Sequence, residues 1–201
     1  MALPKAFDDL SFTDIALAKR DSSRPQFTVI YGHGGLGKTT TACYSHDPVI
    51  LPVGRETGQE RMIDHGIPCF ENVTDIDPIN FVFGCLAKLL KTEHSRKTLI
   101  IDNIGTYREA VDEEVIKDNP TTGGKESKIV TSLSDYGYGK GQAMAYPYYT
   151  KLLAGIDVLM KKKGMHVILL GHDVLYNINK EDGTYYQRTG INAPAGENTN
   201  V

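Results

Sequence analysis

A phosphate-binding loop is the residue pattern in this chain with the most specific chemistry. Its eight positions follow the pattern G-x-x-x-x-G-K-[ST] and are Gly32, His33, Gly34, Gly35, Leu36, Gly37, Lys38 and Thr39. Glycines let the backbone fold tightly enough to direct its N–H groups at a phosphate chain. We therefore expect Lys38 to contact the β- and γ-phosphates of a nucleotide and the Thr39 hydroxyl to bind Mg²⁺, with Thr40 completing the binding segment.

The residues on either side of the loop give it the context that this chemistry requires. The run 27–31 is β-branched and aromatic and predicts a strand, whereas residues 39–44 predict the first turns of a helix. A helix that starts at the loop adds its positive dipole end to the attraction for phosphate. A glycine-rich turn that matched the pattern by accident would have no reason to lie between a strand and a helix.

A second candidate for phosphate chemistry is Asp102, which directly follows the apolar run 98–101. A hydrophobic strand that ends in an aspartate is the Walker B pattern, whose carboxylate helps to hold Mg²⁺ from the carboxyl end of a central strand. Alone, this pattern has low specificity, because many buried strands end in aspartate. Together with the loop it predicts a Mg²⁺ site that uses Thr39 and Asp102.

The residue that would activate the attacking water is less clear from the sequence. Asn103 stands where many ATPases carry a glutamate, so the base must lie elsewhere. Glu56 is the first candidate, because it follows the predicted strand 49–53 and the carboxyl ends of parallel strands share one crevice. Glu60 is the alternative. The simpler interpretation makes Glu56 a solvated loop acid.

His172 follows the predicted buried strand 166–170. A polar side chain at that point can hydrogen-bond the γ-phosphate or the attacking water and report hydrolysis to the next segment of the chain. The alternative is a polar residue that merely ends a buried strand. We expect the first role, because the site has few other positions for a sensor.

The whole chain predicts an α/β fold in which strands alternate with helices. Strands are expected at 27–31, 49–53, 98–101 and 166–170, and helices at 39–44, 78–91, 106–117 and 148–163. Strands that are apolar on both faces and separated by helices indicate a mostly parallel sheet with right-handed crossovers. Residues 54–76 are predicted to be irregular, and those from 173 onward to form a β-hairpin. We expect one domain over 1–201, with 1–24 as an N-terminal extension.

Composition points to an ordinary globular protein. The 201 residues include 22 basic and 25 acidic side chains, a formal net charge of −3, so nucleic acid would need a local basic patch. The three cysteines lack metal-ligand spacing and indicate reduced thiols. The first ten residues lack the apolar core of a signal peptide, and no apolar run is long enough for a membrane helix. We expect a cytoplasmic location.

Several of these segments together resemble a known family. They are residues 31–40, the loop with Glu56, residues 99–103, the Tyr-Gly-Lys-Gly segment 138–141 and residues 164–172. The pattern over roughly 25–190 is similar to phage-encoded AAA-type ATP-binding proteins with a RecA-like core, a group that includes recombination ATPases of single-strand annealing systems. The resemblance implies a RecA-like P-loop NTPase fold, hydrolysis of Mg-ATP, homo-oligomers and binding of single-stranded DNA. It also implies Glu56 as the water-activating base and His172 as the sensor.

Two segments correspond to DNA-contacting loops in RecA-like proteins, namely 118–141 and 173–192. Their candidate contact residues are Lys125, Lys128, Lys140, Tyr185, Tyr186 and Arg188. Lysines with tyrosines between them suit a phosphate groove with base stacking. The simpler interpretation is solvated charges and tyrosines that pack on a sheet edge, since acidic residues lie in the same loops. A phage or host single-strand-binding protein is a further candidate partner.

Three functional hypotheses remain open on the sequence alone. The first is a DNA-dependent ATPase of RecA-like type. The second is a small-molecule kinase, which normally needs an arginine-rich lid, although residues 118–141 contain no arginine. The third is a nucleotide-binding interaction module with little turnover, which the missing Walker B glutamate leaves open.

Overall fold

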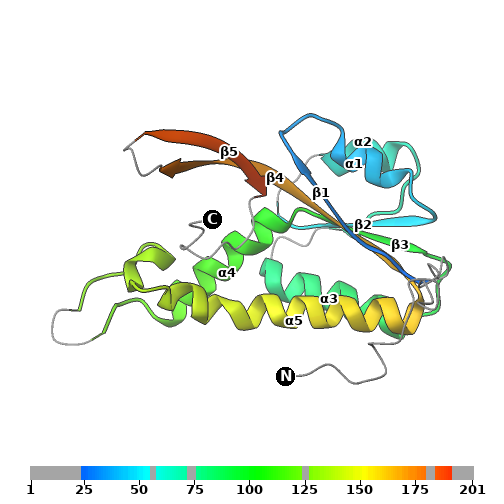
Figure 1. Ribbon diagram of the computed structural model, residues 1–201. Coiled ribbons are helices and arrows are strands. Elements are labelled where there is room, and N and C mark those ends of the chain that lie inside the picture. Colours follow the sequence, from blue (N-terminus) through cyan, green and yellow to red (C-terminus); the bar gives the residue numbers. More distant parts are fainter. Residues whose placement is uncertain (1–23, 55–57, 72–75, 124–126, 180–183, 192–201) are drawn as a thin grey trace, which may run out of the picture.

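The central feature of the protein is a twisted sheet with a parallel core (Figure 1). The computed structural model describes residues 24–54, 58–71, 76–123, 127–179 and 184–191. Four strands lie in the order β1-β4-β3-β2, all parallel, and a fifth pairs with β4 in the antiparallel sense. The strands are β1 (Phe27–Gly32), β2 (Pro48–Pro52), β3 (Thr98–Asp102), β4 (His166–Asn179) and β5 (Tyr185–Ile191). This architecture confirms the predicted α/β fold and is that of a RecA-like P-loop NTPase.

Helices cover both faces of the sheet (Figure 1). The helices are α1 (Lys38–Cys43), α2 (Gly58–Asp64), α3 (Pro78–Lys91), α4 (Ile104–Asp118) and α5 (Lys140–Lys163). In β3, Leu99 and Ile101 face the large cluster formed with α3, α4 and α5, whereas Ile100 faces the smaller cluster formed with α1 and α2. Because each face of the strand is buried, its residues are apolar without alternation, as the sequence indicated. No helix in the described ranges has the length and apolar character needed to cross a membrane.

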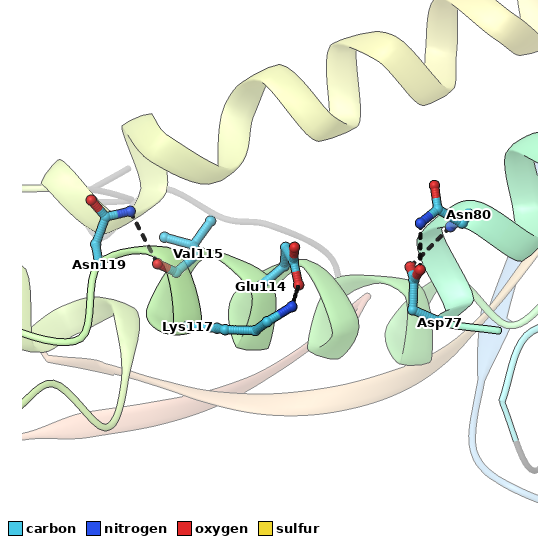
Figure 2. A network of polar contacts seen from close by, with 6 residues as sticks. All are labelled: Asp77, Asn80, Glu114, Val115, Lys117 and Asn119. Atoms are coloured by element: carbon cyan, nitrogen blue, oxygen red, sulfur yellow. Dashed lines mark hydrogen bonds and ion pairs between the residues drawn. The ribbon is translucent and has the colours of Figure 1, made fainter. Parts of the chain in front are cut away.

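Local signals fix the ends of the two middle helices. The Asp77 side chain caps α3 by accepting a hydrogen bond from the backbone N–H of Asn80 at 3.0 Å. At the C-terminal end of α4, the Asn119 side chain donates a hydrogen bond to the carbonyl of Val115 at 3.2 Å (Figure 2). Such caps satisfy backbone groups that a helix leaves without internal partners. They explain why the predicted helices 78–91 and 106–117 match the structure closely.

Two helices differ from the sequence-based expectation. Residues 58–64, within the stretch predicted to be irregular, form α2, whose buried Met62 packs in the same cluster as Ala42 of α1. A helix this short is stabilised by tertiary packing and not by its own propensity. Helix α5 begins at Lys140 and not at Tyr148, so it contains Pro147 in its interior. Proline lacks a backbone N–H and normally breaks a helix interior, but the 24-residue helix continues through it.

Strand β4 is also longer than predicted. Its first part pairs in parallel with β1 and β3, and from Asp173 onward it pairs with β5 in an antiparallel hairpin. The hairpin is therefore confirmed, but it is the continuation of the strand that was expected to end at Leu170. The strand continues because β5 supplies a new hydrogen-bonding partner where β1 and β3 end.

Strand β1 lies at the edge of the parallel sheet with an uncovered apolar row. Phe27, Val29 and Tyr31 are 42%, 43% and 50% exposed. They pair in register with residues 167, 169 and 171 of β4, two of which, Val167 and Leu169, belong to the large core cluster. The row is thus the continuation of a core face that the described helices do not cover.

Candidate nucleotide-binding site

The phosphate-binding loop connects β1 to α1 at the carboxyl end of the sheet. Residues 33–37 form the turn, and the backbone of Gly35 and Gly37 is left-handed, with φ angles of 80° and 79°. Only glycine adopts this conformation without steric cost, which explains why the pattern has glycine at these positions. Left-handed glycines that alternate with other residues in a turn point successive N–H groups into one concavity, which suits an anion.

Lys38 folds back over this loop. Its ammonium donates hydrogen bonds to the backbone carbonyls of Gly32 at 2.8 Å and His33 at 3.0 Å. An ammonium has three donors, so one remains for a phosphate oxygen while two hold the side chain over the loop. This geometry is compatible with a contact between Lys38 and a nucleotide phosphate, which stays a prediction.

Thr39, in the first turn of α1, meets Asp102 at the end of β3, although β4 separates β3 from the strand β1 that precedes the loop. The Thr39 hydroxyl donates a hydrogen bond to the Asp102 carboxylate, with 2.8 Å between Oγ1 and Oδ2. A hydroxyl and a carboxylate are hard oxygen ligands of the kind that Mg²⁺ prefers, and Mg²⁺ typically takes one or two such groups together with water and nucleotide phosphates. These residues fit the ion that the phosphate-binding loop implies.

The groups around Asp102 only partly offset the effect of its burial. Asp102 is 5% exposed, and burial raises the pKa of its carboxyl above the usual value. The hydrogen bond from Thr39 and the charges of His172 and Lys38 act in the opposite direction and lower that pKa. A divalent cation beside the carboxylate would favour its ionised form further. The structure thus brings Lys38, Thr39, Asp102 and His172 into one electrostatic neighbourhood.

His172 lies within β4 and not after its end. It pairs in register with Gly32, which is the last residue of β1 and the first of the phosphate-binding loop. The next residue, Asp173, lies 3.7 Å from the imidazole of His33 and begins the pairing with β5. Strand β4 therefore connects the phosphate-binding loop directly to the hairpin.

Comparison with known proteins identifies the family. The family model described as AAA domain matches residues 24–200. This chain belongs to the AAA family. The match supports a nucleotide-binding ATPase in general terms, and no curated protein matches the chain.

In this AAA domain, Asn103 has a structural role. It is 3% exposed, and its side-chain oxygen accepts a hydrogen bond from the backbone N–H of Thr106 at 2.9 Å, which caps α4. An asparagine is a favoured N-cap, whereas a glutamate is not. The helix start therefore gives a physical reason for the residue that replaces glutamate after the Walker B aspartate.

The start of α2 lies against the phosphate-binding loop. A Cβ at Gly58 would come within 3.3 Å of the Thr39 hydroxyl oxygen. The predicted base Glu56 lies two residues earlier, outside the described residues, while the alternative, Glu60, is exposed in the first turn of α2.

Sequence reasoning missed Gln59. It is 8% exposed, and its side-chain carbonyl has no hydrogen-bond partner among the described residues. Buried polar atoms are normally paired, so an orphan atom one residue from Gly58 identifies a polar group near the site. The sequence feature that could have pointed to Gln59 is its position directly after Gly58.

The predicted DNA contacts of the AAA domain are distributed over two segments that extend toward the left of Figure 1. Lys128 and Lys140 are exposed, and Tyr185 and Tyr186 of β5 are 64% and 44% exposed. Lys125 lies outside the described residues, and Arg188 is described only as part of the β5 backbone. Exposure is compatible with DNA contact and equally with a solvated surface, so these assignments stay predictions.

Proposed function

We propose that this AAA domain is a phage-encoded ATPase that binds and hydrolyses Mg-ATP and acts on single-stranded DNA in recombination or annealing. The observation that carries the ATPase part is the contact between Thr39 and Asp102, with Lys38 folded over the same loop. Two sequence patterns that are distant in the chain form one site with the ligand types that Mg-ATP requires. The DNA part is supported by the resemblance described above and by the exposed residues of the hairpin.

Each residue of the site has a distinct role in this mechanism. Lys38 binds the β- and γ-phosphates, and Thr39 and Asp102 would hold Mg²⁺, which neutralises charge that develops on the phosphates. Glu56 accepts a proton from the attacking water, while His172 hydrogen-bonds the γ-phosphate or that water. Because phosphoryl transfer depends mainly on position and charge, small displacements of these groups control the rate.

Strand β4 supports a coupling between the nucleotide and DNA. His172 and Asp173 lie at the point where β4 passes from the parallel sheet to the hairpin. A change in their contacts when the γ-phosphate leaves would reach β5 through the backbone of one continuous strand. The DNA-facing residues in this proposal are Lys125, Lys128, Lys140, Tyr185, Tyr186 and Arg188.

The proposed homo-oligomer is supported by the uncovered row of β1. Phe27, Val29 and Tyr31 are apolar or aromatic, side by side on one face and about half exposed. An edge strand with such a row is a common site of association between chains. Substitution of Val29 by lysine would shift the protein toward monomers in light-scattering measurements, and an unchanged mass would contradict a role for this row.

The decisive experiment is phosphate release from Mg-ATP with and without single-stranded DNA. The proposal predicts turnover that DNA stimulates, that Lys38→Ala abolishes and that Glu56→Gln reduces strongly. Stimulation that survives Lys38→Ala would show that another site is responsible. Double-stranded DNA of the same length is the matched control for the nucleic acid.

The third hypothesis, a binding module with little turnover, is favoured by one observation. Asn103 caps α4 in the position where a glutamate would activate water. This hypothesis predicts tight, Lys38-dependent binding of ATP with slow turnover that DNA does not change. The same assay therefore separates the two functions.

A further inference from the structure

Helix α2 buries two side chains against the rest of the protein, Gln59 and Met62. Met62 packs in the apolar cluster that contains Ile50 of β2 and Ile100 of β3. Gln59 lies three residues earlier, and residues three apart in a helix are neighbours on one face. The buried face of α2 therefore begins with a polar side chain and continues with an apolar one.

The polar end of this face lies at the proposed Mg²⁺ ligands. Gly58, directly before Gln59, lies so close to Thr39 that a Cβ on it would come within 3.3 Å of the hydroxyl oxygen. Asp102 follows Ile100 by two residues in β3, and side chains two apart in a strand point to the same face of the sheet. That face is the one covered by α1 and α2 (Figure 1). Gln59, in the first turn of α2, thus lies at the same end of the same face as the two ligands.

The side-chain carbonyl of Gln59 is a buried acceptor without a donor in the described part of the chain. The residue is only 8% exposed. Burial of a polar group without a hydrogen bond is unfavourable, so each such group in a native protein needs an explanation, such as a catalytic role or a bound ion or water. Met62 shows that the same helix face accommodates an apolar side chain. Packing alone therefore does not explain a glutamine at this position.

The ion that fits Thr39 and Asp102 brings suitable donors with it. Mg²⁺ dehydrates reluctantly, so it keeps several water ligands beside one or two protein groups and the nucleotide phosphates. A neutral amide carbonyl can accept a hydrogen bond from such a water without placing a second negative charge beside Asp102. Partners of this outer kind orient the ligands of a metal site, and their loss typically lowers metal affinity or activity about 10- to 100-fold.

We propose that Gln59 positions the Mg²⁺ ion of the nucleotide site by accepting a hydrogen bond from a water in the coordination shell of the ion. Because it acts through that water, Gln59 is a positioning residue and not a metal ligand. This inference rests on the proposed binding of Mg-nucleotide and adds a third side chain to the two expected ligands. It does not depend on which side chain activates the attacking water.

The test measures how much Mg²⁺ tightens the binding of ADP to the full chain. Calorimetric titrations in Mg²⁺ and in EDTA give two dissociation constants, and their ratio reports the contribution of the ion. Gln59→Leu removes the acceptor and keeps a side chain of similar size. We expect its ADP affinity in EDTA to stay within twofold of wild type and the Mg²⁺-dependent gain to fall about tenfold or more. Gln59→Glu retains acceptor oxygens and should keep the gain.

Gln142→Leu is the matched control. Gln142 also has a buried side-chain carbonyl without a partner among the residues described, but it belongs to α5, which lies on the opposite face of the sheet (Figure 1). Its substitution should leave both dissociation constants unchanged. Thermal melting without ligand is a second readout, because both leucine variants remove a buried unpaired acceptor and should melt at or above the wild-type temperature.

The outcomes distinguish this inference from the proposed function. A Gln59→Leu protein that keeps the full Mg²⁺-dependent gain would overturn the inference and leave the proposed ATPase intact. Equal weakening of ADP in Mg²⁺ and in EDTA would also overturn it, because the effect would then lie on the nucleotide. Loss of the gain in Gln59→Glu, which keeps an acceptor, would do the same. If the wild-type protein does not bind ADP, or binds it equally well without Mg²⁺, the proposed Mg-nucleotide site fails as well.

Discussion

Thr39 donates a hydrogen bond to Asp102 across 63 positions of sequence, and this contact joins the phosphate-binding loop to the end of β3. Thr39 lies in the first turn of α1 and Asp102 ends β3, and β4 lies between β3 and the strand β1 that leads into the loop. Before any ligand binds, the oxygen atoms proposed for Mg²⁺ are therefore already close. A site assembled in this way loses little entropy when the ion and nucleotide arrive.

The substitution Asp102→Asn should separate stability from activity. The asparagine can still accept the Thr39 hydrogen bond but removes a carboxylate whose ionised form is disfavoured by burial. We expect the variant without Mg²⁺ to melt at or above the wild-type temperature. Its Mg²⁺-dependent ATP hydrolysis should fall about a hundredfold, because ~3 kcal/mol of charge stabilisation by the ion is lost.

The readouts are differential scanning fluorimetry and phosphate release. Asp157→Asn, which changes an exposed carboxylate on α5, is the control and should leave both unchanged. Wild-type turnover in Asp102→Asn would contradict the assigned role of this carboxylate.

Low pH should destabilise the short 3₁₀ helix η2 (Leu133–Tyr136) by protonating the Asp135 carboxylate. Hydrogen bonds from the backbone of Thr131 and Ser132 hold the pKa of Asp135 below its usual value. The carboxylate therefore contributes stability that is complete above the ordinary pKa of aspartate, about 3.9, and is lost as pH falls through the lowered value.

Amide exchange measured by NMR tests this pH dependence. Asp135→Ala should reduce the protection of the Thr131 and Ser132 amides at pH 6, and the difference from wild type should vanish in strong acid. A difference that persists at the lowest pH would show that charge is not the cause.

Gly141 should tolerate no side chain. A Cβ at this position would overlap the backbone carbonyl of Leu133, which cannot move without shifting η2 away from α5. We expect Gly141→Ala to lower the free energy of unfolding by about 1–3 kcal/mol. Gly84→Ala in α3 is the matched control, since a Cβ there meets nothing within 4 Å, and it should raise that free energy by about 0.5–1 kcal/mol. Urea unfolding curves that move equally for both variants would contradict the steric explanation.

The three thiols should react slowly in the folded protein. Burial raises the pKa of Cys43, Cys69 and Cys85 to about 11 in each case. Since the thiolate is the nucleophile, alkylation at pH 8 should be about a hundredfold slower than for an unstructured cysteine and should accelerate as pH rises toward 11. Mass spectrometry after iodoacetamide treatment would count the labelled thiols, with urea-unfolded protein as the reference. Rapid labelling of any one of them at pH 8 would disprove its burial.

Local patterns were sufficient where neighbouring residues decide the structure. The loop from Gly32 to Thr39, the strand that ends in Asp102 and the capped helix at 78–91 all follow from glycine conformation, apolar runs and capping residues. Such signals depend on contacts between residues that are close in the sequence, so these features can be predicted without knowledge of the tertiary structure. The family match over 24–200 agrees with that interpretation.

Other features depended on contacts between distant segments. Helix α2 exists because Met62 packs with α1, and β4 extends to Asn179 because β5 pairs with it. The sequence gives no physical reason for the glycines of the Tyr-Gly-Lys-Gly segment. The structure explains the last one, Gly141, because the backbone of Leu133 lies too close for a side chain.

The sequence by itself determined the candidate residues for phosphate chemistry, because a glycine-rich loop, a lysine and an aspartate after an apolar run are specific in type and spacing. Only the tertiary structure decided that Asp102 lies within hydrogen-bond distance of Thr39, that His172 lies inside a continuous strand and that Gln59 is buried. The physical reason is that strand order and helix packing arise from the burial of apolar surface between distant segments, which no local pattern records.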